Sequence, residues 1–216
     1  MMAGLRPPRV IAAVAIYLPR VSPPPSPLLP ALALLPIRPA MRAILETAGP
    51  EGIAIDGILG PSHVSTVIGS APYDFVPRDF GKPLVIAGFE PLDVMQATLM
   101  LIRQINAGRA EVENQYRRAV TPEGNRKAQA LMAEVLTLRD TFEWRGLGFL
   151  PDSAQRLNEA FADFDAEQRF RVAVPPSFEV KGCECPAVLR GIKEPADCRP
   201  FGTVRTPDTP TGSCLV

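Results

Sequence analysis

The sequence predicts an α/β fold, in which a partial parallel-sheet, Rossmann-like domain is followed by an irregular cysteine-bearing metal-binding domain. Three observations lead to this prediction. The apolar run over 84–87 lies between Pro83 and Gly88, as expected of a strand buried on both faces of a parallel sheet. An amphipathic helical pattern over 91–107 follows it. All four cysteines lie in the last part of the chain, which is rich in proline and glycine.

The chain divides into three parts by composition. Residues 1–35 contain arginine but no acidic residue, and ten prolines fall within the first 40 residues. Proline removes amide donors and fixes φ, so we expect residues 1–30 to lack stable secondary structure. The acid-free start is similar to a transit peptide, but its proline content argues against the amphipathic helix of such peptides. An α/β domain is expected over 36–140 and the cysteine-bearing domain over 141–216.

Four short elements are predicted before the central strand. A helix over 40–46 ends before Gly49-Pro50, and alternating apolar residues over 53–58 are typical of a strand. A turn over 60–62 then leads to a short helix over 63–68, for which Ser62 is the expected N-cap.

The helix over 91–107 has the clearest pattern in the chain. Pro91 falls at the first helical position, where its missing amide needs no partner, and Gly108 ends the helix. With the strand over 84–87 it forms a strand–loop–helix unit. Its apolar residues recur at three- and four-residue spacing and share one face: Leu92, Met95, Leu99, Ile102 and Ile105.

Fewer helices and strands are expected after this strand–loop–helix unit. A helix is predicted over 126–138, with Asn125 as its N-cap, and a short helix over 153–164. From Pro175 onward proline, glycine and cysteine dominate, and such a segment needs a device such as a metal centre to hold it. The apolar stripe of the first of these helices is Ala128, Leu131, Met132 and Val135.

Composition disfavours several classes of protein. The 216 residues are 46% hydrophobic and carry 23 Lys+Arg against 23 Asp+Glu. A general nucleic-acid binder would carry a basic excess, and the apolar runs are far shorter than the ~20 residues that a membrane helix needs. We therefore expect neither nucleic acid nor a membrane as partner. The chain also lacks a GxxxxGK[ST] phosphate loop and a GxSxG nucleophile elbow.

His63 and Glu90 are the candidate catalytic residues, because each follows a predicted strand. Open α/β sheets bind ligands at the carboxyl ends of their strands, so we expect both side chains to face one cleft. His63 is the only histidine, and a neutral imidazole binds iron or transfers protons near neutral pH. Structural alternatives stay open for both: a histidine that caps the turn, and a carboxylate that caps a helix N-terminus.

Cys183, Cys185, Cys198 and Cys214 are the candidate metal ligands. Their grouping is compatible with an iron–sulfur cluster, a zinc site or disulfides. Zinc sites prefer cysteine pairs with a wider spacing than Cys183-x-Cys185, and nothing in the sequence indicates the oxidising compartment that disulfides need. The spacing therefore favours iron–sulfur ligation by a modest margin.

Six segments of the chain are long and unusual enough to carry a resemblance. They are Pro61-Ser62-His63-Val64-Ser65, Ala87-Gly88-Phe89-Glu90-Pro91-Leu92-Asp93, Arg103-Gln104-Ile105-Asn106, Glu111-Val112-Glu113-Asn114-Gln115-Tyr116, Phe142-Glu143-Trp144-Arg145-Gly146-Leu147-Gly148 and Val188-Leu189-Arg190-Gly191. Together with the cysteines, these segments resemble the HypD family, the iron–sulfur scaffold proteins of [NiFe]-hydrogenase maturation. The resemblance covers about residues 36–216.

The resemblance implies a cytoplasmic protein of two α/β domains and a third, cluster-bearing domain. Such a protein works with a HypC-like chaperone to assemble an Fe(CN)2CO unit, for which HypE-like and HypF-like proteins supply the cyanide. His63 and Glu90 match motif positions that line the family's cleft near the iron site, and Gly88 and Phe89 belong to the same Gly-Phe-Glu motif. This role is that of a metallocentre assembly scaffold more than of a turnover enzyme.

The chain departs from the family pattern in its cysteines. The family's cluster pattern is Cys-x12-Cys-x6-Cys-x16-Cys, and Cys185 and Cys198 match its first two positions. The third position falls on Arg205, and the fourth would fall beyond Val216. Only two of the four ligands of the implied [4Fe–4S] cluster are therefore matched, although the other two cysteines could stand in.

The chain also departs from the family at its start. The motifs of the family's N-terminal half do not occur in this sequence, and residues 1–35 are no recognisable substitute for them. Two alternative functions therefore stay open beside hydrogenase maturation. One is a stand-alone zinc- or iron-binding module, and the other is an inactive fragment that lacks the iron-site half. We also expect the isolated chain to expose apolar surface and to aggregate.

Overall fold

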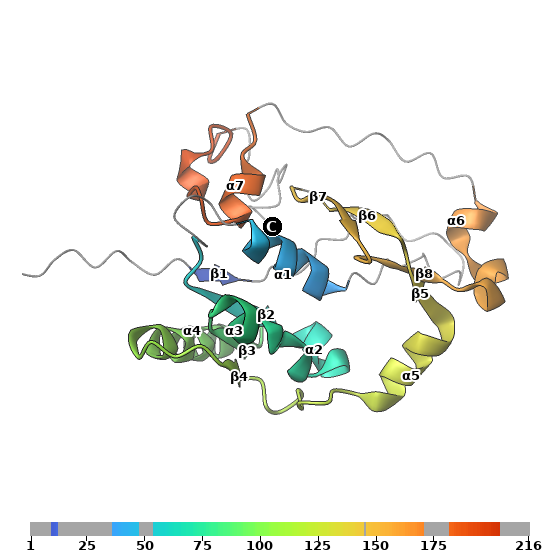
Figure 1. Ribbon diagram of the computed structural model, residues 1–216, viewed down its shortest axis with the longest axis horizontal. Coiled ribbons are helices and arrows are strands. Elements are labelled where there is room, and N and C mark those ends of the chain that lie inside the picture. The colour runs from blue at the N-terminus through green and yellow to red at the C-terminus, as the bar shows by residue number, and fades with distance from the viewer. Residues whose placement is uncertain (1–9, 13–35, 48–53, 145, 171–181, 204–216) are drawn as a thin grey trace, which may run out of the picture.

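A parallel four-stranded sheet is the centre of the computed structural model, which describes residues 10–12, 36–47, 54–144, 146–170 and 182–203. Its strands follow the chain in the order β1-β2-β3-β4, and each pairs in parallel with the next (Figure 1). The α/β class and the parallel sheet that the sequence predicts are thus confirmed. The strands are β1 (Val10–Ala12), β2 (Gly57–Pro61), β3 (Leu84–Ala87) and β4 (Val112–Asn114).

β3 is the interior strand that its apolar run predicts. It lies between β2 and β4, and its side chains alternate between two cores. Leu84 and Ile86 belong to the core on one face of the sheet, and Val85 and Ala87 to the core on the other face. Both faces of the strand are therefore covered, which explains why no polar residue interrupts it.

β1 corrects the expectation that residues 1–30 lack secondary structure. Its three residues pair in parallel with residues 57–59 of β2. The segment Val10–Ala12 contains no proline, so its amides can join the sheet although prolines occur on either side of it. The remainder of 1–30 lies outside the described residues.

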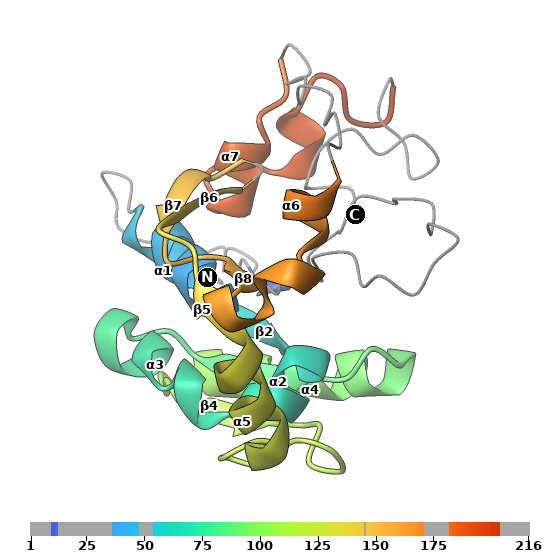
Figure 2. The ribbon, with the colours of Figure 1, turned by 90° about the vertical axis from the view of Figure 1, so that its right-hand side faces the viewer.

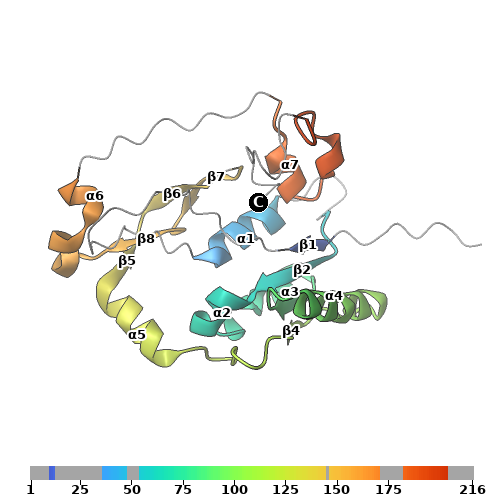
Figure 3. The same ribbon diagram turned by 180° about the vertical axis from the view of Figure 1, so that it is seen from behind.

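The larger core lies between one face of the sheet and three helices, α1 (Ile37–Glu46), α2 (Ser62–Ile68) and α3 (Phe75–Phe80). A short 3-10 helix, η1 (Ala71–Tyr73), connects the last two. Tyr73 and Phe75 are buried in this core, and the guanidinium of Arg42 lies 5.1 Å from the centroid of the Phe75 ring. Figures 1 and 3 both place α1 between the sheet and the later part of the chain.

Three details of this first half differ from the sequence prediction. α1 begins at Ile37 rather than near residue 40, because a proline at position 39 is tolerated in the first helical turn. β2 begins at Gly57, where the lack of a side chain leaves room for Leu101 of the next layer. Ser62 is the first residue of α2 and not its N-cap, and its hydroxyl is buried without a hydrogen-bond partner among the described residues.

α4 (Pro91–Asn106) covers the other face of the sheet. It begins at Pro91 as predicted and ends at Asn106, one residue before the predicted end, with the left-handed Gly108 just beyond. The face that packs on the sheet is centred on Ala97 and Leu101, which are both fully buried. Of the apolar stripe identified in the sequence, Leu92, Met95 and Leu99 are exposed on the opposite face, where Leu92 is 75% exposed and Met95 is 70% exposed. Ile105 of the same stripe packs against the core on the sheet side.

The second half of the chain begins with α5 (Arg126–Val135), which leads away from the sheet (Figure 1). Asn125 is its N-cap as predicted, since its Oδ1 accepts a hydrogen bond from the amide of Ala128. The helix ends at Val135 rather than at 138, because β5 (Leu136–Leu138) pairs antiparallel with β8 (Gln155–Leu157). None of its predicted apolar stripe is buried in the part of the chain that is described.

Two small antiparallel sheets and short helices make up the remainder. β6 (Thr141–Trp144) pairs with β7 (Gly148–Pro151), and the helix expected over 153–164 is replaced by β8 and the 3-10 helix η2 (Glu159–Phe164). Figure 2 shows these elements above α2, α3 and α4. The division near residue 140 stays a prediction. The last elements are α6 (Ala166–Arg169), α7 (Cys185–Leu189) and η3 (Pro195–Asp197).

The helices are short. Within the described ranges, none combines the length and the apolar character needed to cross a membrane.

Candidate functional site

The carboxyl ends of β2 and β3 place the predicted site residues at one edge of the sheet. Pro61, the last residue of β2, is in register with Ala87, the last residue of β3. α2 begins directly after β2, and residues 88–90 link β3 to α4. This edge is where parallel α/β sheets bind ligands.

The rings of His63 and Phe89 lie in contact across this edge. Their centroids are 4.5 Å apart and their planes are tilted by 43°, within the range of favourable aromatic pairs. His63 is exposed on the first turn of α2, and Phe89 is 50% exposed. The contact brings together two of the motifs that carry the family resemblance, and it leaves both rings open to a ligand.

Glu90 does not cap α4 with its side chain. It occupies the N-cap position with extended backbone, but its side chain makes no capping hydrogen bond. Oε2 of Glu90 instead accepts a hydrogen bond of 3.0 Å from Nη2 of Arg118, which follows β4. The structure therefore sets the helix-cap alternative aside, while the expectation that Glu90 and His63 face one cleft stays a prediction.

Arg118 and Asp93 form the strongest polar contact at this edge. Arg118 donates from both terminal nitrogens to the two oxygens of Asp93, and Nη1 lies 2.9 Å from Oδ1. Gln115 donates to the same Oδ1 over 2.9 Å. Asp93 is almost fully buried, and the hydrogen bonds from Arg118, with smaller contributions from Glu90 and Gln115, hold the pKa of its carboxyl well below the usual range.

Gly88 is required by close packing rather than by its backbone angles. A Cβ at this position would overlap the Asp93 carboxylate and would lie 2.7 Å from the ring of Tyr116. The amide of Gly88 faces Oε1 of Gln115 at 3.5 Å. The first residue of the Gly-Phe-Glu motif thus packs against Asp93 and Tyr116, which both contact Arg118, and Arg118 holds the last residue of the motif.

Sequence reasoning missed Arg118 as a functional residue. Its only signal is its position just after the Asn114-Gln115-Tyr116 motif, where Arg117 is an equally plausible candidate. The structure separates the two: Arg118 lies over the Tyr116 ring at 4.0 Å and reaches Asp93, whereas Arg117 donates to the backbone oxygen of Asn114.

The cysteines lie in a different part of the molecule, around α7. Sγ of Cys183 and Sγ of Cys185 are 3.2 Å apart, and Sγ of Cys198 lies 4.0 Å from the backbone oxygen of Gly182. Cys185 and Cys198 are buried. Cys214 lies outside the described residues.

An iron–sulfur cluster is the group that these cysteines are expected to hold. Such a cluster is normally held by four thiolates. Among the residues that the structure describes, no group of three or more His, Cys, Asp and Glu side chains is placed to hold a metal ion. The described cysteines alone thus do not fit the cluster that the family implies, and no chemical step is assigned to it.

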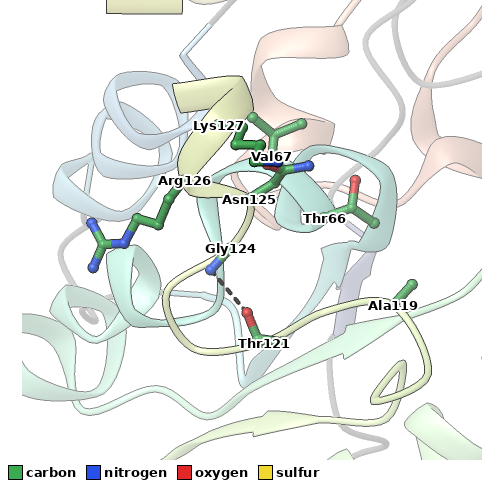
Figure 4. A pocket seen from close by; sticks show the side chains of 8 residues that line it. All are labelled: Thr66, Val67, Ala119, Thr121, Gly124, Asn125, Arg126 and Lys127. Carbon is green, nitrogen blue, oxygen red and sulfur yellow. Dashed lines mark hydrogen bonds between the residues drawn. The ribbon is translucent and has the colours of Figure 1, made fainter. Parts of the chain in front are cut away.

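A cavity of about 550 Å³ lies beside α2, where the chain turns into α5 (Figure 4). Thr66 and Thr121 contribute to its lining, and the amide of Gly124 donates to Oγ1 of Thr121. The side chain of Arg126 points away from the cavity in Figure 4. Neither His63 nor Glu90 lines this space, so it is separate from the edge described above.

Fold and site together define an α/β protein with a candidate ligand-binding edge, formed by a histidine, an aromatic ring and a carboxylate held by arginine. The chain belongs to the HypD family, described as "Hydrogenase formation hypA family", which matches residues 25–216. The resemblance expected from its motifs is thus confirmed.

Curated relatives are named as hydrogenase expression/formation proteins or hydrogenase maturation factors. The hydrogenase expression/formation protein HupD of Azotobacter chroococcum is 61% identical over 181 residues, which cover 82% of this chain and 47% of that protein. The hydrogenase maturation factor HypD of Azotobacter vinelandii is 60% identical with the same coverage. A putative hydrogenase expression/formation protein of Methanocaldococcus jannaschii is 41% identical over 178 residues, which cover 82% of this chain and 48% of that protein. The chain spans about half the length of the curated relatives it matches.

Proposed function

We propose that this chain is a hydrogenase maturation protein, which serves as a scaffold in assembling the Fe(CN)2CO unit of [NiFe] hydrogenase. The observation that carries the proposal is the contact of His63 with Phe89, since it joins two family motifs at the edge of the sheet that suits ligand binding. Membership of the HypD family supports a role in hydrogenase formation. The partners proposed are a HypC-like chaperone and a HypE-like cyanide donor, in the cytoplasm.

In this proposal the iron unit is the cargo of the protein and not a resident cofactor. The exposed imidazole of His63 is a ligand suited to iron or a group that moves a proton. The Phe89 ring beside it shields one side of such a ligand from water. Glu90 adds a negative charge at the same loop, held in place by Arg118. The arrangement binds and orients a metal unit, which is the work of a scaffold.

The test is a maturation assay in a bacterium that lacks its own family member. The chain is co-expressed with the other maturation proteins. The segment of a family protein that this chain does not span is supplied as a separate polypeptide. The readouts are hydrogenase activity and the infrared bands of cyanide and carbon monoxide on the purified scaffold–chaperone complex. We expect His63→Gln and Glu90→Gln to lower both readouts at least tenfold.

The control is Glu134→Gln, which removes the same charge from the exposed surface of α5. It is expected to leave both readouts at the wild-type level. If His63→Gln and Glu90→Gln also mature hydrogenase as well as the wild type does, this edge is not the assembly site.

A further inference from the structure

Arg118 connects two segments that are far apart in the sequence. It follows β4, and its guanidinium reaches back to Glu90 and Asp93, at the junction of the 88–90 loop and α4. The two nitrogens that bind Asp93 form a fork against its two oxygens. Such a bidentate pair fixes the plane of the guanidinium as well as its position.

Two further contacts keep the guanidinium in this plane. It lies 4.0 Å from the centroid of the Tyr116 ring. Asp93, its main partner, receives a second donor from Gln115, whose Oε1 in turn faces the amide of Gly88. Asp93 and Tyr116 therefore both contact the guanidinium besides Glu90, and Gln115 in turn holds Asp93.

The remaining contact acts on the loop. Nη2 donates both to Asp93 and to Oε2 of Glu90, so the position of the Glu90 carboxylate depends on the Asp93–Arg118 pair. Glu90 is 60% exposed at its side chain and Arg118 is 51% exposed. Ion pairs this exposed contribute little to stability, so the effect of this contact is on orientation rather than on folding.

We propose that Arg118 is the positioning residue of the candidate site: it holds Glu90 and, through the Gly88–Glu90 loop, keeps the Phe89 ring against His63. The use of this arrangement in iron-unit assembly rests on the proposed function. The positioning itself is a property of the chain alone and is measured on the chain alone.

The experiment uses the single histidine of the chain as its reporter. The ring of Phe89, 4.5 Å away, shifts the NMR resonances of the His63 ring protons by its ring current. Phe89→Leu removes that ring and gives the reference for complete loss. We expect Arg118→Gln to move the His63 resonances at least half of the way to this reference, with the helical circular dichroism retained.

Arg118→Lys and Arg117→Gln complete the set. Lysine keeps the charge but cannot form the fork, so Arg118→Lys is expected to move the resonances in the same direction by a smaller amount. Arg117→Gln alters the neighbouring arginine, which does not bind Asp93 or Glu90 among the described contacts, and it should leave them unmoved. If Arg118→Gln does not fold, Arg118→Lys decides the question.

The proposal is overturned if the folded Arg118 variants keep the wild-type His63 resonances, or if Arg117→Gln moves them equally. The maturation assay is a separate readout. Arg118 variants that shift the His63 resonances but mature hydrogenase normally would count against the proposed function and leave the positioning role intact.

Discussion

The backbone of Gly88 lies directly against the carboxylate of Asp93, so that a methyl group at position 88 would overlap one of its oxygens. The Tyr116 ring closes the same space from another side, 2.7 Å from where the methyl carbon would be. Asp93 is itself held by Arg118 and Gln115 and has little freedom to withdraw. The loop can therefore take this path only with glycine at position 88.

Gly88→Ala is expected to destabilise the chain by about 2–3 kcal/mol, the upper part of the range for forcing extra atoms into a packed site. Urea unfolding monitored by circular dichroism measures this. The control is Gly108→Ala, where the backbone is left-handed but a Cβ would meet nothing within 4 Å. We expect that variant to lose only the ~1–2 kcal/mol of the left-handed conformation. Equal stability of Gly88→Ala and wild type would contradict the packing argument.

Acid is expected to weaken the fold through Asp93. Arg118 above all, then Glu90 and Gln115, lower the pKa of this carboxyl in the folded state, whereas an aspartate in an unfolded chain titrates near pH ~3.9. The stabilising contribution is therefore complete above about pH 5 and is lost as the pH falls through ~4 toward the lower folded value. The free energy of unfolding, measured with urea over this pH range, should fall less steeply with decreasing pH in Asp93→Asn than in wild type.

Asp163→Asn is the matched control for this titration. It removes an exposed aspartate on η2 and is expected to leave the acid dependence of wild type unchanged. An Asp93→Asn chain that loses stability in acid as steeply as wild type would show that the Asp93–Arg118 pair does not contribute to it.

Because the outer face of α4 exposes apolar side chains, we expect the isolated chain to self-associate. Leu92 is 75% exposed and Met95 is 70% exposed on one face of this helix, with Leu99 beside them. The substitutions Leu92→Gln and Met95→Gln together should reduce the light scattering of concentrated solutions several-fold. The free energy of unfolding should change by no more than ~0.5 kcal/mol, as for other surface substitutions.

The buried face of the same helix gives the contrast. Leu101 is fully buried against the sheet, so Leu101→Ala is expected to lower the free energy of unfolding by about 2–5 kcal/mol. If the Leu92 and Met95 substitutions are the destabilising ones instead, the packing assigned to α4 is wrong.

Iron binding is expected to be incomplete. Arginine keeps its proton and cannot bind iron, and Arg205 occupies a position where the family pattern has cysteine. After anaerobic reconstitution we expect fewer than four irons and four sulfides for each chain. Arg205→Cys should raise the iron content, whereas Arg156→Cys, which adds a thiol on β8, should not. Four irons with the EPR signal of a reduced [4Fe–4S] cluster in the unaltered chain would refute this expectation.

Local signals in the sequence determined those helices and strands whose limits depend on residues only a few positions apart. The apolar run over 84–87 determined a strand buried on both faces, and Pro91 and Gly108 determined the limits of α4. Asn125 determined the start of α5 through a hydrogen bond within its first turn. In each case the signal lies within the element or directly at its ends, so the pattern alone was sufficient. The motifs likewise determined the family.

Tertiary structure decided the features whose partners lie far apart along the chain. α5 stops at Val135 because the next residues pair with β8, and β1 is a strand because β2 accepts it. α4 has apolar residues on two faces, and the sheet selects the one with Ala97 and Leu101 because the small alanine and the bare backbone of Gly57 allow close approach.

The same distinction separates the site residues. His63 and Glu90 each follow a strand that the sequence predicts, so their placement at the sheet edge followed from local pattern. Arg118 reaches Glu90 only because β4 pairs with β3 and brings the segment after it beside the 88–90 loop. Its role depends on a fork of hydrogen bonds to Asp93, and the contact between these two side chains exists only once the sheet has formed.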